Sequence, residues 1–258
     1  MIALLSVAFF SLLFVGSHVV LATPPLRTRL VERFGERGFF LLYSALATVL
    51  YVLWVNSYAT QRFAGPPGPA LGEISLLRWP LMAVAVLGLT IAGAGIFAYP
   101  RLPSALFDQP IRQPYGIERV SRHPFFSGIA LFAVAHALLV SHLTSVVFFG
   151  ALAFLSVAGA RLQDRKLLAR RGAAYESYLA QTSFWPFAAQ LRGATPLTVS
   201  ELPWFALAGA FVSSLWFRSV HGSLFAHGGL LVILAVVGGA AVAAFNAWRR
   251  ARRMAQGG

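Results

Sequence analysis

Runs of about 20 apolar residues recur along this chain, and they constrain its fold more than any other feature. Each run is long enough to cross the roughly 30 Å hydrocarbon core of a bilayer as an α-helix. Charged residues make up only 11% of the sequence, whereas soluble domains carry about 25%. We therefore predict an all-α integral membrane protein, a single domain over 1–258 with about six or seven transmembrane helices, near 2–22, 39–58, 79–99, 125–140, 143–160, 202–217 and 229–248.

Basic residues gather in the links between these runs and predict the orientation of the chain. With the N-terminus outside, 18 of the 21 Lys and Arg residues face the cytoplasm, and only Arg62, Arg78 and Arg218 lie outside. Cytoplasmic loops of membrane proteins carry such an excess. We expect a protein of the bacterial inner membrane with a cytoplasmic C-terminus, and a basic helix at 162–180 along the inner membrane surface.

The net charge of +13 would suggest a nucleic-acid partner in a soluble protein. Here the cations lie at helix ends, so we predict membrane lipid with anionic headgroups as the partner and no nucleic acid. The sequence leaves the oligomeric state undetermined. It contains no cysteine, which excludes disulfides, thiolate metal ligands and covalent haem attachment. None of the eight acidic residues falls inside a predicted span, which disfavours an ion-coupled transporter.

Two histidines lie inside predicted spans, His18 in the first and His136 in the fourth. Ionisable residues within a membrane mark candidate functional sites. Each imidazole could donate a hydrogen bond to a neighbouring helix, or the two could bind a metal or a haem. His123 differs, because it lies in Arg122-His123-Pro124 at the cytoplasmic start of the fourth span. We expect the remaining three histidines to be solvated loop residues: His142, His221 and His227.

An ordered set of segments resembles the NnrU family, which includes membrane isomerases of 15-cis-zeta-carotene. The segments are Ser17-His18, Phe34–Phe39, Gly116–Pro124, Ala135-His136, Asp164–Lys166, Tyr175–Ser177 and Thr182–Ala189. The resemblance implies a non-covalent haem b, with His18 and His136 as iron ligands, that assists cis–trans isomerisation of an apolar polyene. We also assign Arg122 and His123 as candidate catalytic residues. Ala133 occupies the position of a cysteine in the isomerases, which separates this chain from any mechanism that needs a thiolate.

Two other interpretations remain open. One is a non-enzymatic NnrU-type factor in nitrogen-oxide respiration, which would use the same two histidines. The other is an S-adenosylmethionine-dependent membrane methyltransferase, which the chain resembles in its Arg122-His123-Pro124 segment, its helical hairpin and in Gly172, Tyr175, Tyr178 and Pro186. The methyltransferases open the helix after the hairpin with a pair of Glu residues, where this chain has Gln163-Asp164.

The predicted span edges place His18 and His136 at different depths in the membrane. His18 lies about five residues and His136 about twelve residues from the inner edge, a difference of roughly 10 Å along a helix. The depth of His123 in the membrane differs from that of His18 by a similar amount, but in the opposite direction. A single haem iron bound by two of these residues would therefore require tilted or irregular helices.

Overall fold

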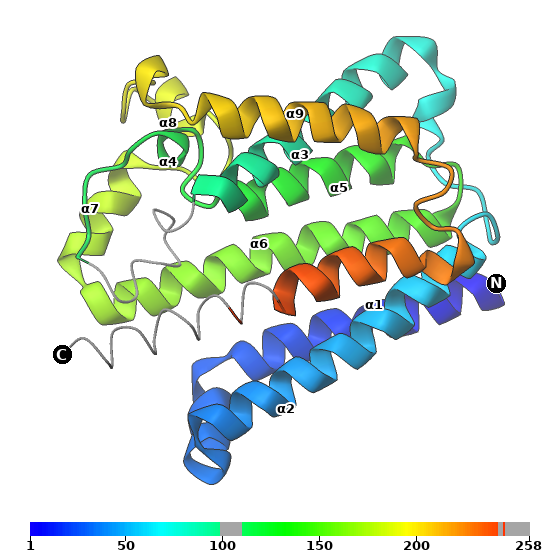
Figure 1. Cartoon of the computed structure of the whole chain (residues 1–258), viewed down its shortest axis with the longest axis horizontal. Helices are drawn as coiled ribbons and strands as arrows, with labels where there is room; N and C mark the ends of the chain where they lie inside the picture. The colour runs from blue at the N-terminus through cyan, green and yellow to red at the C-terminus, as the bar shows by residue number, and fades with distance from the viewer. Residues whose placement is uncertain (99–109, 242–244, 246–258) are drawn as a thin grey trace.

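The computed structural model describes residues 1–98, 110–241 and 245, and these residues form helices and no strand (Figure 1). This confirms the all-α fold class. In chain order the elements are α1 Ile2–Ala22, α2 Pro24–Gln61, η1 Leu71–Glu73, α3 Ser75–Ala98, α4 Ile117–Val120, α5 Pro124–Leu139, α6 Leu143–Arg171, α7 Ala173–Gln181, α8 Ala188–Leu191, η3 Val199–Glu201, α9 Trp204–Ser219 and η4 His227–Gly229.

In each of the seven predicted spans, most of the described residues are helical. Four of them, α1, α2, α3 and α6, are long and apolar enough to cross a membrane. Three shorter helical segments correspond to the other spans: α5, α9 and the apolar segment His227–Ala241. The last part of the predicted span 229–248 lies mostly outside the described residues, as do Tyr99, Arg101 and the four arginines between 249 and 253.

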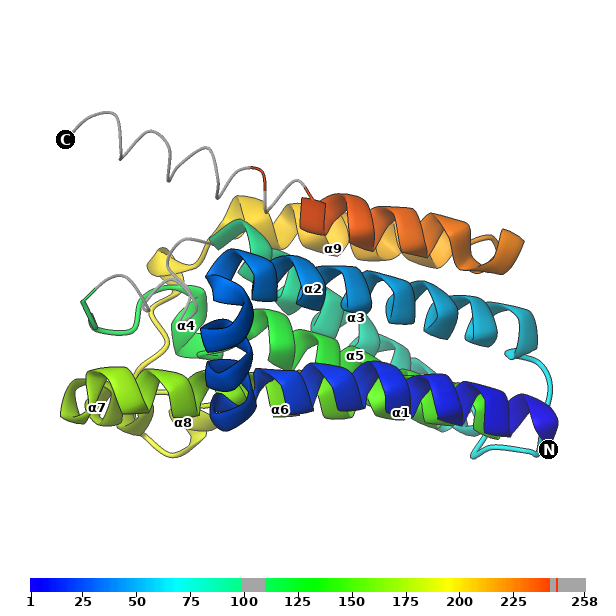
Figure 2. The ribbon, with the colours of Figure 1, turned by 90° about the horizontal axis from the view of Figure 1, so that it is seen from below.

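The helices pack in an order that differs from their order in the chain. Helix α9 packs on α3, α3 on α5, α5 on α6, α6 on α1, and α1 on α2. Figure 1 shows α6 between the α3, α5 and α9 group and the α1 and α2 pair, and Figure 2 shows the same helices from below. Helices α5 and α6 form the hairpin expected from the two-residue link at Ser141-His142, because only Val140–His142 separates them.

Small residues allow α3 and α5 to approach closely. A Cβ atom built on Gly88 would lie 2.6 Å from the carbonyl oxygen of Gly128, so neither position has room for a side chain. Such contacts are typical of membrane helices, where backbone proximity and van der Waals packing drive association. This packing positions α5, which carries His136.

Aromatic residues dominate the largest core cluster, where α1, α2, α5 and α6 meet. Its most deeply buried rings come from Trp54, Tyr58, Phe148 and Phe149. The outward faces of the helices are apolar and exposed, as at Phe205, which is 98% exposed. In a bilayer these apolar side chains would contact lipid, so they need not be buried inside the protein.

Two glycines change the helix boundaries relative to the sequence-based expectation. The expected surface helix at 162–180 is divided at Gly172, whose φ of 51° ends α6 before α7 begins. Glycine adopts such positive-φ conformations without steric cost, which is why it commonly ends helices. Gly35, with φ 71°, interrupts α2 in the same way. The beginning of α2 therefore turns away from the rest of that helix (Figure 2).

Candidate functional site

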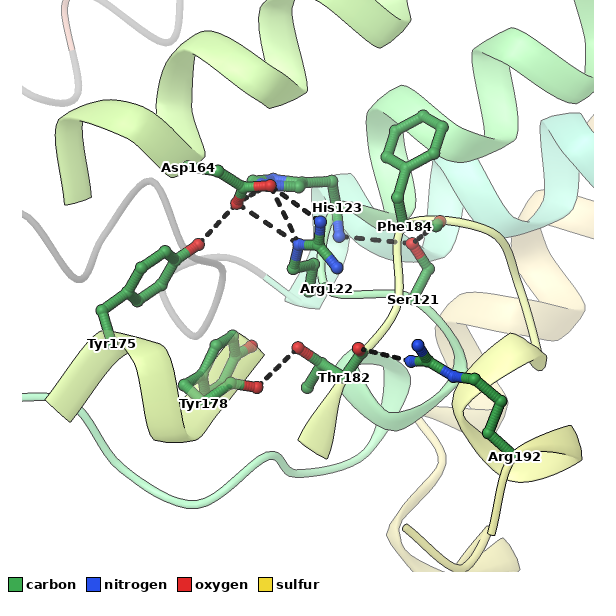
Figure 3. Close-up of polar contacts among 9 residues, drawn as sticks. All are labelled: Ser121, Arg122, His123, Asp164, Tyr175, Tyr178, Thr182, Phe184 and Arg192. Atoms are coloured by element: carbon green, nitrogen blue, oxygen red, sulfur yellow. Dashed lines mark hydrogen bonds and ion pairs between the residues drawn. The ribbon is translucent and has the colours of Figure 1, made fainter. Parts of the chain in front are cut away.

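A polar cluster lies where the N-terminus of α5 meets the C-terminal part of α6 (Figure 3). The carboxylate of Asp164, on α6, accepts hydrogen bonds from Arg122 Nε at 3.0 Å and Nη2 at 2.8 Å. His123 Nε2 lies 2.7 Å from its Oδ1 atom, and the hydroxyl of Tyr175 donates to the same oxygen at 2.6 Å. One carboxylate thus joins the start of α5 to α6 and α7.

The charge of Asp164 depends on these neighbours. Helix α6 has 29 residues, about 43 Å, so Asp164 lies about 32 Å from Leu143, beyond the predicted span 143–160. Burial alone would raise the pKa of Asp164, but the hydrogen bonds and charges of His123 and Arg122 outweigh it and lower the pKa to about 2. Burial, and then the adjacent Asp164 charge, raise the pKa of Tyr175. The cluster is therefore a charged carboxylate beside a neutral phenol.

The segment Gly116–Pro124 is held by further polar contacts. Glu118, with a side chain 1% exposed, pairs with Arg112 at 3.0 Å, and Arg119 pairs with Glu201 at 2.8 Å. Ser121 donates its hydroxyl hydrogen to the carbonyl of Phe184 at 2.7 Å. This ties the motif to the segment Thr182–Ala189, so two stretches that the family resemblance singled out lie together.

The two membrane histidines share one hydrogen-bonding pattern. His18 Nδ1 lies 2.8 Å from the carbonyl oxygen of Phe14, and His136 Nδ1 lies 3.0 Å from that of Phe132. A carbonyl oxygen only accepts, so Nδ1 donates in each case, and Nε2 of the neutral ring keeps its lone pair. No hydrogen bond to either Nε2 is found within the described part of the chain. Imidazoles held in this way suit iron ligation.

A continuous row of aromatic rings connects these two histidines. Successive ring centroids are 4.3, 4.7, 4.4, 5.3 and 4.8 Å apart along His18, Phe14, Trp54, Phe148, Phe149 and His136. The indole of Trp54, in the middle of this row, donates to Ser11, which lies seven residues before His18 on α1, at 2.8 Å. That spacing corresponds to about 10 Å along the helix.

The structure brings Arg122 and His123 together with Asp164, and not with His136. His123 lies 13 residues before His136 on the same helix, a separation of about 20 Å. The ring nitrogen Nε2 of His123 already contacts a carboxylate, whereas Nε2 of His136 has no such partner among the described residues. Of these two histidines, His136 is therefore the one whose Nε2 has no carboxylate contact among the described residues.

The sequence-based account missed His221. It follows α9, and its ring centroid lies 6.2 Å from that of His136, with the two ring planes 23° apart. Its side chain is exposed, as expected for a loop residue, but it is not isolated. Partial burial, then the positive charges of Arg218 and Arg62, lower the pKa of His221. No pattern in the sequence brings this turn to the end of α5.

Asp164 and Tyr175 were also missed as partners of Arg122 and His123. They lie about 40 to 50 residues further along the chain. The one available signal was that Asp164 is an acidic residue in a strongly basic stretch. His142, in contrast, forms the N-terminal boundary of α6 and contacts Ser141 at 3.1 Å. Within the described ranges, no group of three or more His, Asp or Glu side chains is arranged to hold a metal ion.

Comparison with known proteins shows which proteins this chain is similar to. The family model described as "NnrU protein" matches residues 6–248. The chain is 28% identical over 165 residues to 15-cis-zeta-carotene isomerase, chloroplastic, from Zea mays, which covers 62% of this chain and 43% of that protein. It is 27% identical over 209 residues to the protein of the same name from Arabidopsis thaliana, which covers 75% of this chain and 52% of that protein.

The chain spans about half the length of the curated relatives it matches. No solved structure matches it. The family match covers nearly the whole chain and includes His18, the Gly116–Pro124 segment, His136 and Asp164. The chain therefore belongs to the NnrU family.

Proposed function

We propose that this protein is a membrane isomerase that converts a cis double bond of an apolar polyene, of the 15-cis-zeta-carotene type, to the trans form. The observation that carries the proposal is the family relationship to proteins named as that isomerase, together with two membrane histidines whose Nε2 atoms are available. Haem b is the proposed cofactor, and His18 and His136 are its proposed ligands. Packed aromatic rings lie between the two imidazoles in this structure, so both could bind one iron only if these rings moved apart.

The chemistry of the substrate supports this assignment. A polyene has no titratable group, so acid–base catalysis by side chains has little to act on. A bound haem iron would supply the electron-accepting or Lewis-acidic centre that lowers the double-bond character of the polyene. The lipid-facing surfaces of the bundle suit a substrate that arrives from the bilayer.

The protein's own residues would hold and position this centre. The carbonyl groups of Phe14 and Phe132 orient the two imidazoles, and aromatic rings of the core pack against both of them. Arg122 and His123 act about 20 Å away as positioning residues, because their contacts with Asp164 hold the start of α5. The direct catalytic role expected for them from the sequence stays a prediction.

The first test is the visible spectrum of the full-length protein in mild detergent, before and after dithionite. We expect a Soret band that shifts on reduction, and its loss in His18→Ala and in His136→Ala. His142→Ala is the matched control, because His142 lies in the hairpin link, and it should retain the wild-type spectrum. Full haem occupancy in both ligand variants would remove the ligand assignment.

The second test is conversion of 15-cis-zeta-carotene by the haem-loaded protein in lipid, followed by chromatography of the isomers. Loss of the 15-cis isomer with the wild type, and not with His136→Ala, is the expected result. A haem-loaded protein that leaves the substrate unchanged would contradict the isomerase proposal and favour a non-enzymatic haem protein. A protein that stays colourless after haem is added would contradict the haem proposal, and binding of S-adenosylmethionine would then be measured.

A further inference from the structure

The first part of α2, residues 24–34, lies across the bundle at the end predicted to face the cytoplasm. Helix α1 has 21 residues, about 31 Å, so it ends close to the edge of a hydrocarbon core of roughly 30 Å. Helix α2 begins directly after Thr23, and Gly35, with φ 71°, interrupts it. Figure 2 shows the part between them, in dark blue, running across the direction of the long helices. We call residues 24–34 the crosswise segment, and its position places it at the level of the lipid headgroups.

The crosswise segment is amphipathic, as a helix at this level should be. Leu26, Leu30 and Val31 share one side of the helix and are partly buried, whereas Arg29 and Arg33 are exposed. Helices that combine an apolar side with exposed arginines are typical of segments that lie along a membrane surface. The residue pattern therefore agrees with the position of the segment.

Lys166, on α6, lies at the same level. It is about 35 Å along the helix from Leu143, just beyond the hydrocarbon core and within the headgroup layer. Its side chain is partly buried and forms no ion pair with a carboxylate in the part of the chain that the structure describes. Asp164 points elsewhere, because two residues correspond to about 200° around a helix and Asp164 contacts Arg122 and His123.

Cations from the crosswise segment and from α6 surround Lys166. Burial, and then the positive charges of Arg27 and Arg170, lower the pKa of Lys166. Arg27 donates through Nη2 alone to Glu36, at 2.8 and 3.1 Å, and the side chain of Glu36 is 67% exposed. An ion pair this exposed contributes little to stability. Lys166 thus carries its charge in a partly buried position among like charges, where an anion would relieve the repulsion.

We propose that Lys166 and Arg27 bind the phosphate of an anionic phospholipid where the crosswise segment meets α6. The depth of both cations matches that of lipid phosphates, and the apolar side of the crosswise segment suits contact with acyl chains. Ammonium and guanidinium groups both form charge-assisted hydrogen bonds with phosphate oxygens. A zwitterionic lipid would bring a cation of its own to the site, whereas an anionic lipid leaves its phosphate charge for the protein. The bound lipid would thereby attach the crosswise segment to α6.

Thermal unfolding of the full-length protein in detergent tests this assignment, with three probes added separately: phosphatidylglycerol, phosphatidylcholine and inorganic phosphate. The decisive variant is Lys166→Gln. The matched control is Arg165→Gln, which removes one positive charge from the neighbouring, exposed position on the same helix. Without lipid, Lys166→Gln should be as stable as the wild type or more stable, because a partly buried cation that is repelled by its neighbours is removed.

We expect phosphatidylglycerol to raise the Tm of the wild type and of Arg165→Gln, and the other two probes to have little effect. Half of this rise should require a phosphatidylglycerol concentration about fivefold higher for Lys166→Gln, since one cation near an anionic surface is lost. The assignment is overturned if the two variants respond equally, or if phosphatidylcholine stabilises the wild type as much as phosphatidylglycerol does. An equal effect of inorganic phosphate would overturn it as well, because the site would then bind a free anion and not a lipid.

Discussion

The hydroxyl of Tyr175 donates a hydrogen bond to Oδ1 of Asp164 at 2.6 Å, across the break at Gly172 that separates α6 from α7. Asp164 also accepts from Arg122 and lies within hydrogen-bonding distance of His123, so this bond attaches α7 to the start of α5. The contacts of one carboxylate therefore determine how three helices meet at this end of the bundle. They also provide direct tests of the structure.

Two neighbouring tyrosines allow a matched comparison. Tyr175→Phe removes the donor to Asp164 and should lower stability by about 1–3 kcal/mol, because the acceptor is charged. Tyr178, whose ring stacks on that of Tyr175, has a buried hydroxyl without a hydrogen-bond partner among the described residues. Tyr178→Phe should leave stability unchanged or raise it. Thermal unfolding in detergent measures both, and an equal loss in the two variants would contradict the assigned bond.

The acid sensitivity of the fold should follow the titration of Asp164. Its pKa is lowered from an ordinary 3.8 to about 2, so its charged form stabilises the folded state. This contribution, about 2 kcal/mol, is present above about pH 4 and is lost as the pH falls toward 2. The stability difference between wild type and Asp164→Asn should therefore be constant at neutral pH and shrink below about pH 4. A difference that does not change down to pH 2 would contradict the lowered pKa.

His123→Ala should separate the positioning role from iron ligation. The variant loses the contact with Asp164, so we expect a stability loss of about 1–3 kcal/mol and lower isomerase activity. Its haem content per protein, measured as the pyridine haemochrome, should stay at the wild-type level. Loss of haem equal to that of His136→Ala would instead identify His123 as a ligand. His142→Ala serves as the histidine control.

The close approach of α3 and α5 can be tested with two glycines. Gly88→Ala places a Cβ atom 2.6 Å from the carbonyl oxygen of Gly128, so the helices must separate, at a cost of about 1–3 kcal/mol. Gly150→Ala on α6 has no neighbouring atom within 4 Å of the new Cβ and should stabilise its helix by up to about 1 kcal/mol. Thermal unfolding of both variants should therefore shift in opposite directions. A stable Gly88→Ala protein would contradict this packing.

The sequence alone determined the fold class and the approximate position of most of the apolar helices. Long apolar runs must form helices in a bilayer, because every backbone polar group has to bond within its own segment. This is a local requirement, so it can be read from consecutive residues, and it also predicted the hairpin of α5 and α6. His18 and His136 could also be singled out from consecutive residues, because a histidine inside an apolar run is unusual.

Only the tertiary structure decided which distant residues meet. The partnership of Arg122 and His123 with Asp164, and the position of His221 beside His136, join segments about 40 to 85 residues apart. Which helix faces which depends on the packing of small residues such as Gly88 against Gly128, and on breaks at positions such as Gly172. These contacts arise from the shape of the whole bundle, and local hydrophobicity carries no information about them.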